Sequence, residues 1–156
     1  MFKPERILVP TDFSEHEDTC SILAVKQAAA IAAQHKSELI LLHVITEDLY
    51  RKPLFFLDDD KIEELKRQLG DHCHDELERI ARQFVTDPVV KVTTKIRQGV
   101  AYDEILKEEK ESAIDLIAIS SRGQSKLKEF FYGSTTERVV RRATCSVLVV
   151  RKIIDR

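Results

Sequence analysis

Short apolar runs alternate along the chain with longer segments of helical periodicity. Most of the runs are continuous, as expected for strands that are buried on both faces of a parallel sheet. The predicted strands are Ile7 to Val9, Leu39 to Ile45, Val89 to Ile96, Leu116 to Ile119 and Val147 to Val150. The third of these alternates between apolar and polar residues, so we expect it to lie near an edge of the sheet.

Four segments between the runs carry helix signals. The predicted helices are Ser14 to Gln34, Lys61 to Phe84, Tyr102 to Lys110 and Thr135 to Arg142. The first opens with Ser14 and Glu17 in the spacing of a capping box. In the second, apolar residues recur every three or four positions, which predicts one stripe facing the sheet. The stripe consists of Ile62, Leu65, Leu69, Cys73, Leu77, Ile80 and Phe84.

The resulting order, βαβαβαβαβ, predicts an α/β fold. We expect a single domain over residues 1–156, with a doubly wound five-stranded parallel sheet, helices on both faces and Rossmann-like topology. Sheets of this kind bind ligands outside the carboxyl ends of their strands, where the strand order reverses. Ligand-binding residues are therefore expected after the first, second and fourth strands.

The segment after the fourth strand, residues 120–134, is long for a connection in a compact domain. Ser134 and Glu137 have the spacing of a capping box at the start of the last helix. A helix N-terminus offers free N–H groups and the positive end of the helix dipole to an anion. Gly123 and Gly133, two of only four glycines in the chain, allow close approach of the backbone. An ordinary helix start is the alternative, but the loop length favours an anion site.

Polar or chain-ending residues also follow the first two strands. Pro10 ends the first strand because it cannot donate to the ladder. Asp12 then either accepts hydrogen bonds from sugar hydroxyls or closes the turn before the helix. At the end of the second strand, the main chain of Val44 can hydrogen-bond a flat ring, although packing is the commoner reason for such a residue.

Composition places the chain among globular proteins. It has 156 residues, 43% hydrophobic and 33% charged, with a net charge of −2. The near-neutral balance argues against a nucleic-acid partner. A charged N-terminus and the lack of an apolar run of about 20 residues predict a cytoplasmic protein without a membrane anchor. Cys20, Cys73 and Cys145 are scattered and odd in number, which favours reduced thiols over disulfides.

Three further features have competing interpretations. His72, Cys73 and His74 suggest a metal site, but residues one or two apart on a helix point to different faces. Lys126 and Lys128 either attract phosphates or are solvated, and solvation is favoured. The apolar segment Leu54 to Leu57 either packs under the second helix or forms a lid or partner patch, and packing is favoured.

The glycine spacing resembles a family signature. Gly123, nine residues, Gly133 and Ser134 resemble the pattern GxxGx9G[ST] of the universal stress proteins. The stretches ILVPTDFSE, LLHVI and CSVLVVR resemble the same family, in the expected order across nearly the whole chain. The resemblance implies a fold of the adenine nucleotide alpha-hydrolase type, bound ATP with Mg or Mn carried by its phosphates, and a homodimer formed through Ser146 to Val150.

The resemblance also implies a set of nucleotide-binding residues. The set is Pro10, Thr11, Asp12, Val44, Ile119, Ser120, Gly123, Gly133, Ser134 and Thr135. The first three surround the base and ribose, the main chain of Val44 contacts adenine, and the two glycines with Ser134 and Thr135 contact the phosphates.

Ser120 departs from the family pattern, which has glycine at this position. A serine keeps the N–H donor and adds a small side chain that either crowds the sugar or donates to it. If the site requires the torsion angles of glycine, a Cβ costs on the order of 1 kcal/mol and weakens ATP binding several-fold. If the torsion angles are ordinary, little changes.

The P-loop and the dinucleotide-binding fingerprint are both missing from the sequence. It contains no GxxxxGK[ST] and no GxGxxG after the first strand. A base that activates water over the γ-phosphate is not visible, so any hydrolysis is expected to be slow. The leading hypothesis is a dimeric stress-response regulator in which ATP orders the loop 121–132 and changes a surface read by an unknown protein partner. The alternatives are an adaptor of the same fold without nucleotide, and a slow ATPase.

Overall fold

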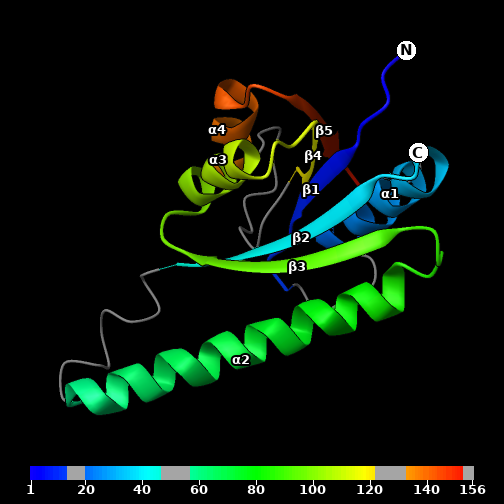
Figure 1. The fold of residues 1–156 in the computed structure, drawn as a ribbon. Helices are drawn as coiled ribbons and strands as arrows, with labels where there is room; N and C mark the ends of the chain where they lie inside the picture. Colours follow the sequence, from blue (N-terminus) through cyan, green and yellow to red (C-terminus); the bar gives the residue numbers. More distant parts are fainter. Residues whose placement is uncertain (14–19, 47–56, 122–132, 153–156) are drawn as a thin grey trace.

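The computed structural model describes residues 1–13, 20–46, 57–121 and 133–152, which form one five-stranded sheet with four helices (Figure 1). The strands are β1 (Arg6–Pro10), β2 (Glu38–Ile45), β3 (Lys91–Gln98), β4 (Leu116–Ser120) and β5 (Ser146–Val150). The helices are α1 (Cys20–His35), α2 (Asp59–Phe84), α3 (Ala101–Glu111) and α4 (Ser134–Arg142). All strand pairs are parallel, in the order β3-β2-β1-β4-β5. The predicted fold class is therefore confirmed, and β3 lies at an edge.

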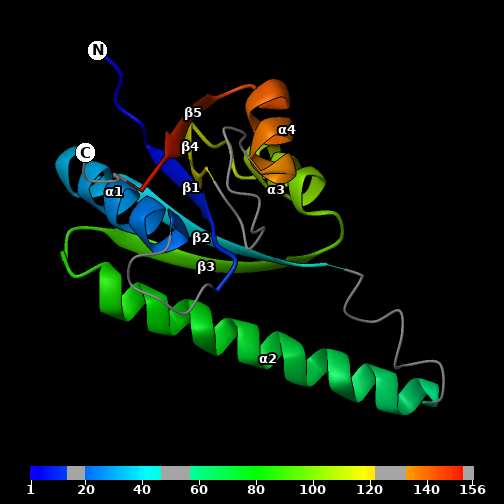
Figure 2. The same cartoon turned by 180° about the vertical axis from the view of Figure 1, so that it is seen from behind.

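The helices cover both faces of the sheet. Helices α1 and α2 lie on one face and α3 and α4 on the other (Figures 1 and 2). Along β1, Ile7 and Val9 pack in the cluster that contains Val25 of α1. Leu8 faces the opposite way and packs in the cluster that contains Ile105 of α3. Because both faces are covered, the central strands read as continuous apolar runs, as the sequence predicts.

Helix α2 overhangs the sheet. A helix of 26 residues spans about 39 Å, whereas the eight residues of β2 span about 26 Å. Only the second half of the predicted stripe is therefore covered: Cys73 and Leu77 are buried, whereas Leu65 is 41% exposed. The prediction that the whole stripe faces the sheet is wrong for the first half of the helix.

The start of α2 also differs from the prediction. The helix begins two residues before Lys61, and the side chain of Asp58 caps it by accepting a hydrogen bond from the backbone N–H of Lys61 at 2.9 Å. Acidic residues at the N-cap and in the first turn are a known start signal, which the apolar spacing alone does not reveal. The segment 54–56, Ser14 with Glu17, and Lys126 with Lys128 lie outside the described residues.

Ion pairs hold α3 against the edge strand. Arg97 on β3 lies 2.8 Å from both Glu104 and Glu108, and Lys95 lies 2.6 Å from Glu108. Burial alone would raise the pKa of Glu108, but hydrogen bonds from Lys95, Ser112 and Arg97 outweigh it, and the pKa is lowered. These contacts fix the helix that forms one wall of the cavity described below.

The structure also tests what the sequence predicts about cysteines, metal ligands and membrane-spanning helices. Cys73 is a buried free thiol and Cys145 a half-buried one, so the packing role expected for Cys73 is confirmed. In the described part of the chain, no three His, Cys, Asp or Glu side chains are grouped so as to hold a metal ion. None of the described helices combines the length and apolar character that a membrane span requires.

Candidate functional site

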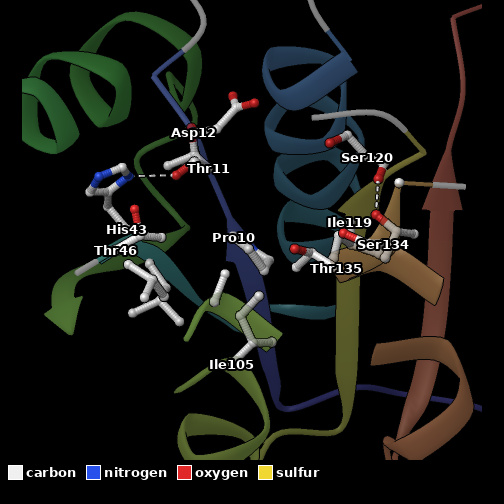
Figure 3. A pocket seen from close by; sticks show the side chains of 15 residues that line it. Pro10, Thr11, Asp12, His43, Thr46, Ile105, Ile119, Ser120, Ser134 and Thr135 are labelled. Carbon is white, nitrogen blue, oxygen red and sulfur yellow. Dashed lines mark hydrogen bonds between the residues drawn. The ribbon is translucent and has the colours of Figure 1, made fainter. Parts of the chain in front are cut away.

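A cavity lies where the strand order reverses between β1 and β4 (Figure 3). Its volume is about 300 Å³. It opens at the carboxyl ends of β1, β2 and β4, and the first turns of α3 and α4 complete its walls. It is lined by Pro10, Thr11, Asp12, Leu42, His43, Val44, Thr46, Ala101, Ile105, Ile119, Ser120, Gly133, Ser134, Thr135 and Thr136. This is the position at which doubly wound sheets bind their ligands.

The end of β1 is fixed by hydrogen bonds from three directions. The N–H of Thr11 donates to the carbonyl of Leu42 at 2.8 Å, and its hydroxyl accepts from Ser21 at 2.8 Å. The carbonyl of Thr11 lies 2.8 Å from Nδ1 of His43 (Figure 3). Asp12, the next residue, lines the cavity from this fixed point.

The first turn of α4 forms the opposite end of the cavity. Gly133 is the N-cap, with φ −53° and ψ 155°, and its N–H donates to the carbonyl of Ser121 at 3.0 Å. The hydroxyl of Thr136 donates to the carbonyl of Ser120 at 2.7 Å. The N–H of Ser121 donates to Val150 at 2.9 Å. The helix start is therefore tied to the ends of β4 and β5.

The predicted capping box at Ser134 is wrong. Ser134 is the first helical residue and not the cap, and no side-chain hydrogen bond caps this helix. Gly133 occupies the cap one residue earlier, and the Thr136 hydroxyl ties the first turn to Ser120. The N–H groups of the first turn still point toward the cavity end of the helix, as they do at any helix N-terminus.

Ser120 adopts ordinary strand geometry. It is the last residue of β4, and the positive φ values among described non-glycine residues occur at Phe13, Lys36 and Ala113. The backbone at this position therefore does not need the torsion angles of glycine. The residue is 8% exposed and its side chain lines the cavity (Figure 3). Of the two outcomes that the sequence leaves open for this position, the structure supports the one without backbone strain.

The middle of the cavity has an apolar wall that the sequence revealed only in part. Val44 and Ile119 were expected there, whereas Ala101 and Ile105 were not. The last two lie on α3, which packs Ile105 in the buried cluster with Leu8 and is also held by ion pairs with β3. Leu42, His43, Thr46 and Thr136 were missed as well. A polar residue within the apolar run LLHVI was the available signal for His43.

The predicted binding residues come together in one place. Every residue of the expected set lines the cavity except Gly123, which lies outside the described residues. Across the sheet, Val44 lies near the end of β2, Asp12 follows the end of β1, and the N-terminus of α4 lies beside the end of β4, while Ala101 and Ile105 of α3 add apolar surface. These features define a doubly wound α/β protein with a cavity at its switch point.

Comparison with known proteins establishes the family. The model of the universal stress protein family matches residues 3–151, so the chain belongs to this family. Universal stress protein MJ0577 of Methanocaldococcus jannaschii is 32% identical over 159 residues, which cover 95% of each chain. The solved structure of MJ0577 matches with a TM-score of 0.82 over 99% of this chain and 100% of that chain.

Two further solved structures share the fold. Universal stress protein UspA from Lactobacillus plantarum is 29% identical, with a TM-score of 0.77 over 94% of this chain and 97% of that chain. A universal stress protein solved in complex with cAMP is 21% identical, with a TM-score of 0.62 over 97% of this chain and 100% of that chain. At this identity, the second likeness concerns the fold alone.

Proposed function

We propose that this protein binds ATP in the switch-point cavity and acts as a dimeric regulator, with the nucleotide as ligand and not as substrate. The observation that carries the proposal is the cavity itself, in which the carboxylate of Asp12 after β1 lies between the Val44 end of β2 and the N-terminus of α4. Base, sugar and phosphate are arranged in the same order along a nucleotide. That the protein has an unknown protein partner and that it is located in the cytoplasm stay predictions from the sequence.

The end of the cavity at α4 suits the phosphates. Ser134 and Thr135 supply backbone N–H groups at the positive end of the helix dipole, and Gly133, whose own N–H is donated to Ser121, lets the backbone come close to the ligand. Ser134 is exposed, so its hydroxyl is accessible to a ligand. A magnesium or manganese ion would be carried by the phosphates themselves, where it would offset their charge.

The other end suits the nucleoside. The carboxylate of Asp12 is placed to accept hydrogen bonds from ribose hydroxyls, and the main chain of Val44 is placed to pair with the edge of adenine. Ile105 and Ile119 supply apolar surface for the flat ring. The related universal stress protein that was solved with cAMP holds an adenine nucleotide on the same fold.

A role as ligand fits the chemistry of the lining better than hydrolysis does. The titratable side chains that line the described cavity are Asp12 and His43. Nδ1 of His43 is engaged by the carbonyl of Thr11 on the β2 side of the cavity, and Asp12 is proposed to bind the ribose. Neither is placed to orient a water molecule at phosphates bound against α4. The slow ATPase therefore stays a weaker alternative.

The first test identifies the ligand. Purified protein is denatured, any released nucleotide is identified, and ATP with magnesium is titrated into the stripped protein by calorimetry. We expect saturable binding by the unmodified chain. Because Ser120 has ordinary torsion angles, Ser120→Gly should change the affinity by less than about threefold. Binding that appears only in Ser120→Gly, or in neither protein, would instead favour the adaptor without nucleotide.

The dimer is proposed to form through β5. This strand lies at the open edge of the sheet, and its central residues Val147, Leu148 and Val149 are only half-buried. An apolar edge strand exposes unpaired N–H and C=O groups, which natural proteins cover or pair. Pairing with a second copy across a two-fold axis would satisfy both strands at once.

We expect Val149→Lys to shift the protein from dimer to monomer, because a lysine in an apolar interface must bury or redirect its charge. Analytical ultracentrifugation measures the shift. Val149→Thr is the matched control, since it keeps the branched shape and adds no charge, and it should remain dimeric. Circular dichroism verifies that both variants are folded. A Val149→Lys protein that sediments as a dimer would place the interface elsewhere.

A further inference from the structure

His43 contacts the residues on both sides of Asp12. Its Nδ1 atom lies 2.8 Å from the carbonyl oxygen of Thr11. Its ring stacks on Phe13, with ring centroids 3.8 Å apart and an angle of 21° between the planes. Because a carbonyl oxygen only accepts hydrogen bonds, Nδ1 carries the proton and donates. Asp12 is therefore flanked by two residues that the same side chain holds.

The two contacts restrain the chain in different ways. Thr11 is fixed in place, since its N–H and hydroxyl are also hydrogen-bonded, to Leu42 and Ser21. Phe13 is fixed in conformation: its φ of 59° lies in the left-handed region, which a bulky side chain adopts only at a cost. Stacking on the His43 ring favours that conformation. Together, the contacts determine the direction in which the chain presents Asp12.

We propose that His43 is a positioning residue for the nucleotide, which holds the Asp12 carboxylate in the orientation that meets the ribose. The proposal rests on the nucleotide-binding function proposed above. Its physical basis is preorganisation: a carboxylate that is already oriented loses less conformational freedom when the ligand binds. Burial lowers the pKa of His43, opposed by the hydrogen bond to Thr11 and the charge of Asp12, which fits a neutral ring that donates through Nδ1.

Two variants of His43 separate the two contacts. His43→Phe keeps a ring that can stack on Phe13 and removes the donor to Thr11. His43→Asn keeps a donor close to the position of Nδ1 and removes the ring. We expect each variant to weaken ATP binding about tenfold, roughly the worth of one lost interaction. Thermal unfolding shows whether each variant is folded.

A double-mutant cycle with Asp12→Ala tests whether His43 acts through Asp12. Once the carboxylate is gone, its orientation no longer matters, so we expect His43→Phe to change ATP affinity by less than about twofold in the Asp12→Ala background. A direct contact between His43 and the ligand, or a general loss of stability, would instead weaken binding equally in both backgrounds. Equal effects would overturn the proposal.

A second measurement does not depend on nucleotide. In ligand-free protein, NMR order parameters of Asp12 and Phe13 should fall in His43→Phe, while those of Leu8 and Val9 stay unchanged. Unchanged order at Asp12 and normal ATP affinity would overturn the role of His43 and leave the nucleotide site intact. If order falls but the unmodified chain binds no ATP, the nucleotide function is overturned, and with it the role proposed for His43.

Discussion

Replacing Ser134 by aspartate should lower the affinity for ATP about a hundredfold without destabilising the fold. Ser134 is the exposed first residue of α4 and lines the cavity end that is proposed to hold the phosphates. Two negative charges about 5 Å apart repel by roughly 3 kcal/mol at an effective dielectric constant of 20. The same carboxylate interacts favourably with the helix dipole, by about 0.3–1 kcal/mol. Binding and stability should therefore change in opposite directions.

Two controls separate charge from shape. Ser134→Asn has nearly the size of aspartate without its charge, and it should retain ATP affinity to within a few-fold. Adenosine has no phosphates, so its binding to Ser134→Asp should match its binding to the unmodified protein. Calorimetry measures the affinities and thermal unfolding measures stability. An aspartate variant that binds ATP normally would show that the phosphates do not lie at α4.

Most of the fold could be predicted from local sequence patterns. Continuous apolar runs such as Leu39 to Ile45 belong to strands that are covered on both faces, and the alternating run Val89 to Ile96 belongs to the edge strand β3. The overhang of α2 could not be predicted, because the stripe continues past Leu69 without any change in spacing. Where a helix leaves the sheet depends on the relative lengths of two elements far apart in sequence, and not on the pattern within either.

The site was predictable where it follows strand ends and unpredictable where it depends on tertiary contacts. The positions of Asp12 and Val44 could be predicted because both residues lie at or just after the carboxyl ends of β1 and β2, and a parallel sheet brings these ends to one edge. Ile105 reaches the cavity because α3 packs against the sheet and pairs with Arg97 of β3, and neither helical periodicity nor motif spacing reveals where the helix docks. The start of α4 also involves a tertiary contact that the spacing of Ser134 and Glu137 does not reveal, since the hydrogen bond from Thr136 to Ser120 crosses from helix to strand.

Glu109 on α3 ties together the two elements that carry the proposed functions. It is 2% exposed, and its Oε1 accepts hydrogen bonds from the N–H and hydroxyl of Thr144 at 2.7 and 2.8 Å and from the N–H of Cys145 at 2.7 Å. These residues form the turn between α4, which borders the cavity, and β5, the proposed dimer strand. One carboxylate therefore fixes the relative positions of both.

Replacing Glu109 by leucine should lower the free energy of unfolding by about 3 kcal/mol, because it leaves two backbone N–H groups without their acceptor, each costing roughly 1–3 kcal/mol when buried. Glu109→Gln is the matched control: it keeps a carbonyl acceptor in place and should lose only about 1 kcal/mol. Urea denaturation measures both. Equal losses would show that packing, and not the hydrogen bonds, explains the effect.

The response to acid gives an independent check on the same residue. Burial alone would raise the pKa of Glu109, but hydrogen bonds from Thr144 and Cys145 outweigh it, and the pKa lies below its usual value of 4.5. Because the folded state holds the proton less tightly than the unfolded state, the contribution of Glu109 is complete above pH 4.5 and is lost as the pH falls through the folded pKa. Unfolding curves for the unmodified protein and for Glu109→Gln should therefore converge as the pH falls below 4.5. A stability difference that persists unchanged under those conditions would show that the turn does not depend on the charge of Glu109.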